Sequence, residues 1–173
     1  MFYLDFGIFY IHFYLSIPCT LILHQFLYGN MLEFYVLNAF GEELMEDNAE
    51  RAIAEACRAH NANILNYTAA PVYAKKNRKG RHQWLIEWEK EPADIKAFAK
   101  ALDEDLRKLN SDYDAKRSGN IFLAEPDIVN ARKGLFDDWL KSKGSHKLGG
   151  QRKVPRLSNS RDMMENLLEM NKI

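Results

Sequence analysis

Hydrophobic and polar residues in the middle of the chain follow patterns typical of an α+β domain. Between residues 82 and 89, Trp84, Ile86 and Trp88 recur at every second position, which predicts a strand with one buried face. Further along, apolar residues recur every three or four positions and predict an amphipathic helix; they are Ile95, Phe98, Ala99, Leu102, Leu106 and Leu109. Pro92 precedes this stripe, near the first helical turn, where proline is tolerated.

Other elements are predicted on both sides of this strand and helix. Strands are expected at 33–40 and 64–73, and a last strand is expected to begin at 121–123 and to be broken or at an edge because Pro126 comes after it. A helix is expected from Asp47, as its N-cap, to about His60. The residues from Asn110 to Gly119 are expected to close the second helix and turn.

The order of these elements, β-α-β-β-α-β, predicts a ferredoxin-like α+β fold. In this arrangement both helices cover one face of an antiparallel sheet. Two added C-terminal helices are predicted by the apolar residues around Trp139 and around Met164.

The first thirty residues differ in composition from the rest. Asp5 is the only formally charged residue among them. The segment 8–27 approaches the roughly 20 residues that a membrane-spanning helix needs, but Pro18 and the lack of flanking Lys or Arg argue against a span. We therefore expect residues 1–30 to be an apolar extension outside the fold, strand-like or unrelated to it, with a membrane anchor as the alternative. Residues 31–173 are expected to form the domain.

Charge is balanced overall but unevenly distributed. The chain has 24 Lys and Arg against 24 Asp and Glu, yet no Lys or Arg precedes Arg51. Positive charge gathers at 75–81 and 141–156, which favours anionic partners locally without indicating a nucleic-acid surface. Cys19 and Cys57 stand in no motif, which favours a reducing, cytoplasmic compartment.

The basic segment KLGGQRKVPRLSNS, residues 147–160, is the strongest candidate for chemistry. Gly149 and Gly150 allow the backbone to bend and to approach a ligand, while Pro155 stiffens the backbone next to Lys153. Lys153 on such a loop suits an ammonium that is delivered to an anionic reacting group. The alternative is a solvated basic connector between two helices.

Other reaction motifs are absent from the sequence. The histidines and cysteines lack metal-ligand spacing, so no metal site is predicted, and no phosphate loop or nucleophile elbow occurs. Glu42, Glu43 and Glu46 cluster at a turn, where acids that precede a helix are favoured by its dipole. A general acid/base pair is the alternative interpretation of these carboxylates.

Five segments resemble the C-terminal portion of the auxin-responsive promoter family, the acyl-acid amido synthetases of plants and their bacterial relatives. They are LNAFGEELMEDNAERAIAEAC (37–57), NYTAAPVY (66–73), GRHQWLIEWEKEP (80–92), LDEDLRKLNSDYDAKR (102–117) and LGGQRKVPRLSNSR (148–161). The lysine-valine-proline-arginine run is the most specific of these features. The chain is similar to the bacterial branch.

The resemblance implies an acyl-adenylate-forming enzyme that uses ATP and Mg²⁺. In such enzymes a large N-terminal domain binds ATP and a carboxylic acid, a smaller C-terminal domain swings to complete the site, and the acyl group passes to an amine. By its place in the motif, Lys153 resembles the mobile catalytic lysine. Arg152, Gly149 and Gly150 are expected beside it at the cofactor.

The resemblance also places Gly41 just past the interdomain hinge, with Glu42 or Glu43 facing the acceptor. The large domain has no counterpart in this chain, so we expect a fragment that is inactive alone and holds neither ATP nor Mg²⁺ tightly. Its expected partners are an N-terminal adenylation domain, a small carboxylic acid and an amine. The alternative is a stand-alone ferredoxin-like binding module that uses its basic loops on an anionic partner.

Overall fold

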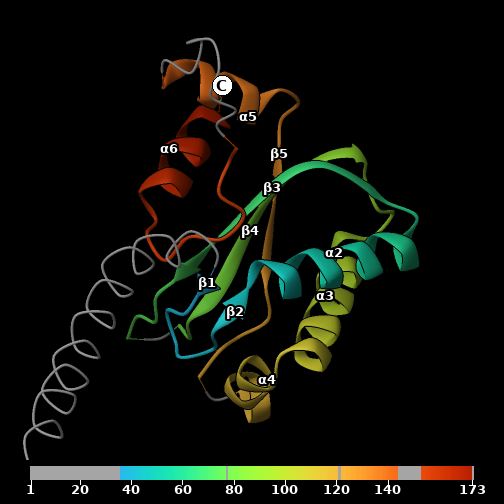
Figure 1. The fold of residues 1–173 in the computed structure, drawn as a ribbon, viewed down its shortest axis with the longest axis vertical. Coiled ribbons are helices and arrows are strands. Elements are labelled where there is room, and N and C mark those ends of the chain that lie inside the picture. The colour runs from blue at the N-terminus through green and yellow to red at the C-terminus, as the bar shows by residue number, and fades with distance from the viewer. Residues whose placement is uncertain (1–35, 77, 121, 144–152, 173) are drawn as a thin grey trace, which may run out of the picture. The chain divides into compact units, whose positions relative to one another are not determined.

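A three-stranded sheet forms the centre of the domain (Figure 1). The computed structural model describes residues 36–76, 78–120, 122–143 and 153–172, all within one compact unit, 34–173. Strands β3 (Asn63–Val72) and β4 (Arg81–Lys90) pair antiparallel, and β5 (Asp127–Ala131) pairs parallel with β4. The strand order is β3-β4-β5, so β4 is central.

Helices α2 (Glu46–His60), α3 (Ile95–Leu109) and α4 (Ser111–Arg117) pack with one face of this sheet. Trp84, Ile86 and Trp88 of β4 lie in this core, as their alternation predicted. The Trp88 ring meets Phe98 of α3 edge-on, with ring centroids 5.0 Å apart. The period-2 pattern of the strand and the helical stripe of α3 thus form one hydrophobic core.

Helices α5 (Leu135–Ser142) and α6 (Asp162–Met170) cover the opposite face, where they form a second core (Figure 1). Leu85, which points away from the tryptophans, is buried in this second core together with Phe136 and Leu167. Because both faces of β4 are covered, residues Trp84–Trp88 are buried without interruption.

Two very short strands, β1 (Val36–Leu37) and β2 (Leu44–Met45), form a separate antiparallel pair before α2. A 3₁₀ turn, η1 (Ser118–Asn120), comes after α4. None of the helices in the described part of the chain is long and apolar enough to cross a membrane. The predictions for residues 1–30 fall outside the described residues.

The α+β class and the two added C-terminal helices are confirmed, while several details of the sheet differ from expectation. The sheet is mixed, because β5 runs parallel to β4. Of the strand expected at 33–40, only β1 is a strand within the described residues 36–40, and it pairs outside the central sheet. The strand expected from 121–123 begins only at Asp127, after Pro126, and Leu123 makes a single parallel bridge with Gly80.

The start of α2 and the segment after α3 also differ from expectation. Helix α2 begins one residue before Asp47, and the Met45 amide at its start donates to Asn48 Oδ1 at 3.2 Å. Asn110 does end α3, but its side chain accepts from the Tyr113 amide at 2.7 Å and thereby caps α4. The expected turn is therefore a further helix.

Candidate functional site

The segment that carries Lys153 is anchored along the outer edge of β3. The Ala69 amide donates to Arg156 O at 2.8 Å, and the Ser158 amide donates to Ala69 O at 3.0 Å. These two bonds form a parallel bridge between Ala69 and Leu157. Thr68 Oγ1 also donates to Pro155 O at 2.7 Å. The backbone after Lys153 is therefore fixed by an added edge pairing.

Two buried side chains fix the same segment from opposite sides. Val154 lies in the core beneath α5 and α6, whereas Leu157 lies in the core beneath α2 and α3. Lys153 immediately precedes the first of these anchors and is exposed. The Lys153 side chain is thus exposed to solvent, while the next residue, Val154, fixes the backbone in the core. Arg152, Gly149 and Gly150 lie outside the described residues.

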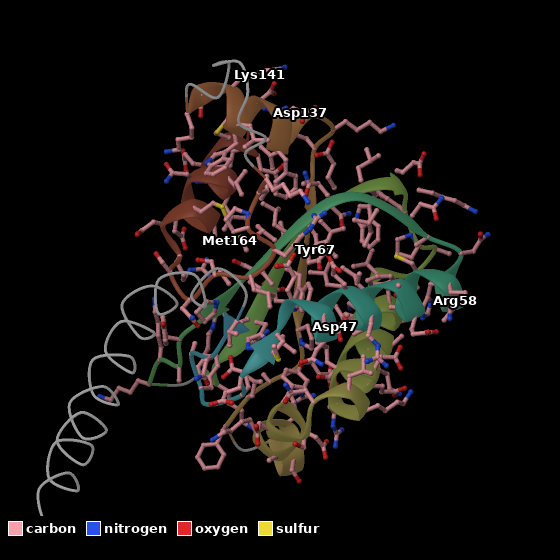
Figure 2. All side chains as sticks on the ribbon, in the orientation of Figure 1. Asp47, Arg58, Tyr67, Asp137, Lys141 and Met164 are labelled. Carbon is pink, nitrogen blue, oxygen red and sulfur yellow. The ribbon has the colours of Figure 1, made fainter. Side chains whose placement is uncertain are left out.

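Arg156 holds the segment in place through its guanidinium. The guanidinium lies over the Tyr67 ring, with its central carbon 4.6 Å from the ring centroid, and donates to Asn66 Oδ1 at 2.6 Å. In the view of Figure 2, Tyr67 lies between Met164 on α6 and Asp47 on α2. Cation–π contact and hydrogen bonding together make Arg156 a positioning residue.

Charged groups surround the ring of Tyr67 and the start of α2. Burial is the main cause that raises the pKa of the Tyr67 phenol, whose oxygen has no hydrogen-bond partner among the described residues. Burial, and then the neighbouring charge of Glu50, raise the pKa of Glu46. The positive charges of Arg156 and Lys153 act in the opposite direction, but the net result is a raised pKa. Lys153 is therefore electrostatically coupled to a carboxylate at the start of α2.

The turn at residues 38–43 surrounds a buried carboxylate. Glu42 is 0% exposed; it accepts from the Phe40 amide at 2.6 Å and lies 2.8 Å from His82 Nε2. Gly41 has a φ of 79°, the left-handed region that glycine adopts without steric cost, and Glu43 has a φ of 41°. Glu42 is thus bound internally, whereas the Glu43 side chain is exposed.

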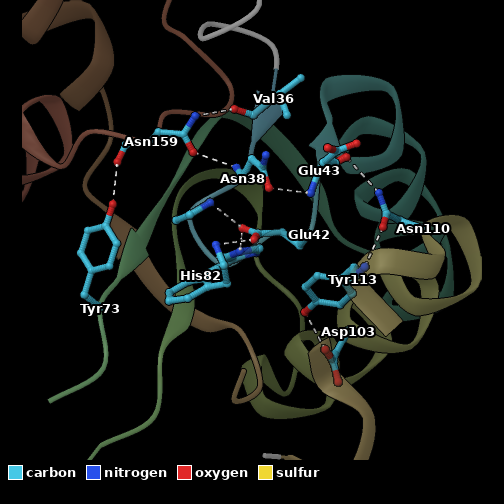
Figure 3. A network of polar contacts seen from close by, with 12 residues as sticks. Val36, Asn38, Glu42, Glu43, Tyr73, His82, Asp103, Asn110, Tyr113 and Asn159 are labelled. Carbon is cyan, nitrogen blue, oxygen red and sulfur yellow. Dashed lines mark hydrogen bonds and ion pairs between the residues drawn. The ribbon is translucent and has the colours of Figure 1, made fainter. Parts of the chain in front are cut away.

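Asn159 connects this turn to the Lys153 segment, as Figure 3 shows. Its side-chain oxygen accepts from the Asn38 amide at 2.7 Å, and its side-chain nitrogen donates to Val36 O at 3.0 Å. The Tyr73 hydroxyl donates to Asn159 O at 3.4 Å. The structure therefore brings together the two regions that sequence analysis had selected separately.

Sequence analysis missed the two residues that organise this arrangement, Asn159 and His82. Both act through partners far away in the chain, and neither stands in a motif that would reveal this. A second buried polar group lies nearby: Arg117 pairs with Asp103 at 2.6 Å, and the Tyr113 hydroxyl donates to the same carboxylate at 2.7 Å (Figure 3). This group fixes α4 against α3 and stays enclosed.

Comparison with solved structures defines the class of the fold. The chain matches a structure described as "GH3.15 acyl acid amido synthetase" with a TM-score of 0.63 and 19% identity, over 79% of this chain and 26% of that chain. It also matches "AtGH3.15 acyl acid amido synthetase in complex with 2,4-DB" with a TM-score of 0.60 and 18% identity, over 79% of this chain and 25% of that chain. The chain therefore has the fold of one part of these synthetases and spans about a quarter of their length.

Sequence comparison then gives the family. The profile of the GH3 family C-terminal domain matches residues 47–162. The chain belongs to the GH3 family, which confirms the family that its motifs indicated. No curated protein matches the sequence.

Proposed function

We propose that this chain is the mobile C-terminal domain of an ATP-dependent acyl acid amido synthetase. Such an enzyme adenylates a carboxylic acid and transfers the acyl group to an amine. Membership of the GH3 family supports this assignment. The observation that carries it is the exposed Lys153, placed directly before the buried anchor Val154. We further propose that the protein is bacterial and cytoplasmic, and that activity requires an N-terminal adenylation domain.

Lys153 is assigned to the stabilisation of charge on the reacting phosphate. Attack of a carboxylate on a phosphate builds negative charge, which an ammonium in a closed cleft stabilises. The anchored backbone of residues 154–158 supports this role, because a charge held in position needs little reorganisation during the reaction. Arg152, Gly149 and Gly150 are proposed to lie beside Lys153 at the same phosphates.

The described residues fit contact with ATP but not a metal site. Lys153 is exposed and has no ion-pair partner among the described residues, so its charge is available to a phosphate. When bound, ATP supplies the adenylyl group that activates the acid. No group of three His, Cys, Asp or Glu side chains within the described ranges could hold a metal ion, so we assign the Mg²⁺ ligands to the adenylation domain.

The turn at residues 38–43 is proposed to lie on the hinge and acceptor side. Glu42 is fully buried and bonded to His82, so its carboxylate is already engaged within the domain. Glu43 is exposed on the same turn, which leaves it as the carboxylate that can face an incoming amine. Gly41 supplies the positive φ that the turn requires.

Restoration of activity tests the proposal. The full chain is mixed with a separately produced N-terminal domain of a bacterial GH3 relative, and carboxylate-dependent exchange of pyrophosphate into ATP is measured. We expect exchange to appear on mixing and to fall about 10²–10³-fold with Lys153→Ala. Lys96→Ala, which removes an exposed lysine from α3, serves as the matched control and should leave exchange unchanged.

Two results would contradict this function. Folded, soluble partners that give no exchange would exclude a complementing domain. Exchange that persists in Lys153→Ala would remove the lysine from the mechanism, even if the family assignment stands.

A further inference from the structure

A basic cleft of about 480 Å³ opens at the β3–β4 hairpin, beside the central sheet. Its walls carry four cationic side chains, one aromatic ring and one carboxylate: Lys75, Arg78, Lys79, Arg81, Tyr73 and Asp127. None of these residues belongs to the Lys153 segment or to the turn at 38–43. The cleft adjoins the site proposed above through Tyr73, whose hydroxyl donates to Asn159 O, but its cationic side chains are different ones.

The hairpin holds two of these cations opposite one another. The Lys75 amide donates to Arg78 O at 2.9 Å, and the Arg78 amide donates to Lys75 O at 2.9 Å. Residues paired in this way carry their side chains on the same face, about 5 Å apart at Cβ, and like charges directly opposite destabilise the pair. The backbone thus enforces a repulsion that a bound anion would relieve.

The cations of this cleft are largely uncompensated. Lys75, Arg78 and Arg81 have no ion-pair partner among the described residues. The single carboxylate of the cleft, Asp127, accepts from Gln83 Nε2 at 2.8 Å. Gln83 Oε1 in turn accepts from Arg161 at 2.9 Å, which fixes the floor of the cleft. One carboxylate cannot balance the positive charges of these three side chains.

The dimensions and charge of the cleft indicate the class of ligand. Small-molecule sites occupy about 300–1,000 Å³, and this cleft falls within that range. Arginine and lysine side chains are the usual ligands of phosphate oxygens. The chain as a whole has a formal charge of zero, so it lacks the broad positive field of a nucleic-acid surface. We propose that the β3–β4 cleft binds a small molecule carrying two or more phosphate groups.

Calorimetric titration of the full chain with inorganic tripolyphosphate tests this site. We expect saturable binding at about 0.15 M salt, the physiological ionic strength, and a rise in the Tm of the chain. The double variant Lys75→Ala/Arg78→Ala should weaken binding about tenfold or more and abolish the Tm shift. Lys90→Ala/Lys96→Ala removes the same net charge from exposed positions outside the cleft and should bind as the wild type does.

Parallel titrations distinguish the sources of phosphate. A nucleoside triphosphate that binds more tightly than tripolyphosphate would add Tyr73, 52% exposed at the rim, to the site as a stacking surface. Equal binding would limit recognition to the phosphates; both results support the proposal. The proposal would be overturned if neither tripolyphosphate nor the nucleoside triphosphate bound, or if the control double variant weakened binding equally. So would tighter binding of a single-stranded oligonucleotide with a steep salt dependence. Lys153→Ala is expected to leave binding unchanged, so the two proposals fail or stand separately.

Discussion

The Asn159 side chain accepts a hydrogen bond from the Asn38 amide at 2.7 Å, across 121 positions of sequence. The same side chain donates to Val36 O at 3.0 Å, so one amide group satisfies a backbone group of β1 and one of the turn that follows it. The position of the turn is consequently tied to the position of the Lys153 segment. Any movement of one relative to the other must break these bonds.

Removal of this connection should loosen the turn. Asn159→Ala leaves the Asn38 amide and Val36 O without their partner, and we expect a loss of about 1–2 kcal/mol in the free energy of unfolding. Hydrogen exchange at the Asn38 amide should become faster. Asn166→Ala removes an exposed amide that, within the part of the chain the structure describes, bonds only to Asp162 O of α6, and it is the control. Unchanged exchange at Asn38 would show that Asn159 does not hold the turn.

The buried carboxylate of Glu42 should be essential for stability. Glu42→Gln keeps the shape of the side chain, but its amide nitrogen replaces one of the two oxygens that accept from the Ala39 and Phe40 amides, so one of these donors loses its acceptor. We expect a loss of about 2–3 kcal/mol, measured by urea unfolding. Glu43→Gln changes the exposed neighbour and should cost little. Equal effects of the two variants would contradict the buried role of Glu42.

Close packing at Gly80 gives a steric prediction. A Cβ atom at this position would overlap the Phe40 ring, whose Cζ would lie only 2.7 Å from it. Gly80→Ala should therefore destabilise the fold by about 1–3 kcal/mol. The cost should nearly vanish when Phe40→Ala removes the ring. Urea unfolding of the two single variants and the double variant measures this coupling. Additive losses would show that the ring and the glycine do not meet.

Coupling between Lys153 and Glu46 can be measured directly. The positive charge of Lys153 lowers the pKa of Glu46, so Lys153→Ala should raise that pKa further above its ordinary value. Titration of the Glu46 carboxyl by NMR gives the result, with Lys96→Ala as the control. An unchanged pKa of Glu46 would mean that the Lys153 ammonium points away from α2.

Sequence patterns predicted the helices and strands whose buried face is determined by their local periodicity. The alternation of Trp84, Ile86 and Trp88 identified β4, and the apolar stripe that includes Phe98 and Leu102 identified α3. The start of α3 was expected at Pro92, but Asp94 caps the helix and places Pro92 before it. In both cases the buried face is determined directly by the period of the pattern. Together these two elements contribute six buried side chains to the main core: Trp84, Ile86, Trp88, Phe98, Leu102 and Leu106.

Elements that depend on distant partners were predicted less well. Leu123 stands in the apolar run 121–123, which suggested a strand, but the chain pairs there at a single bridge and begins β5 only after Pro126. Asn110 was interpreted as a helix terminator, although asparagine also caps helices, and here it does both. The same limit applies to the candidate site. Its lysine stands in a recognisable motif, whereas the hydrogen bonds from the Asn159 side chain to Asn38 and Val36 depend on distant contacts that no local pattern encodes.

Val154 and Leu157 penetrate different cores, one on each side of the sheet. The residues after Lys153 therefore connect the hydrophobic cores on the two faces of the sheet. Removal of the chain from residue 153 onward would strip the edge of β3, delete α6 and open both hydrophobic layers at once. Proteolysis at this point should consequently cause collapse and aggregation, and a shortened version of the domain should not survive as a folded species.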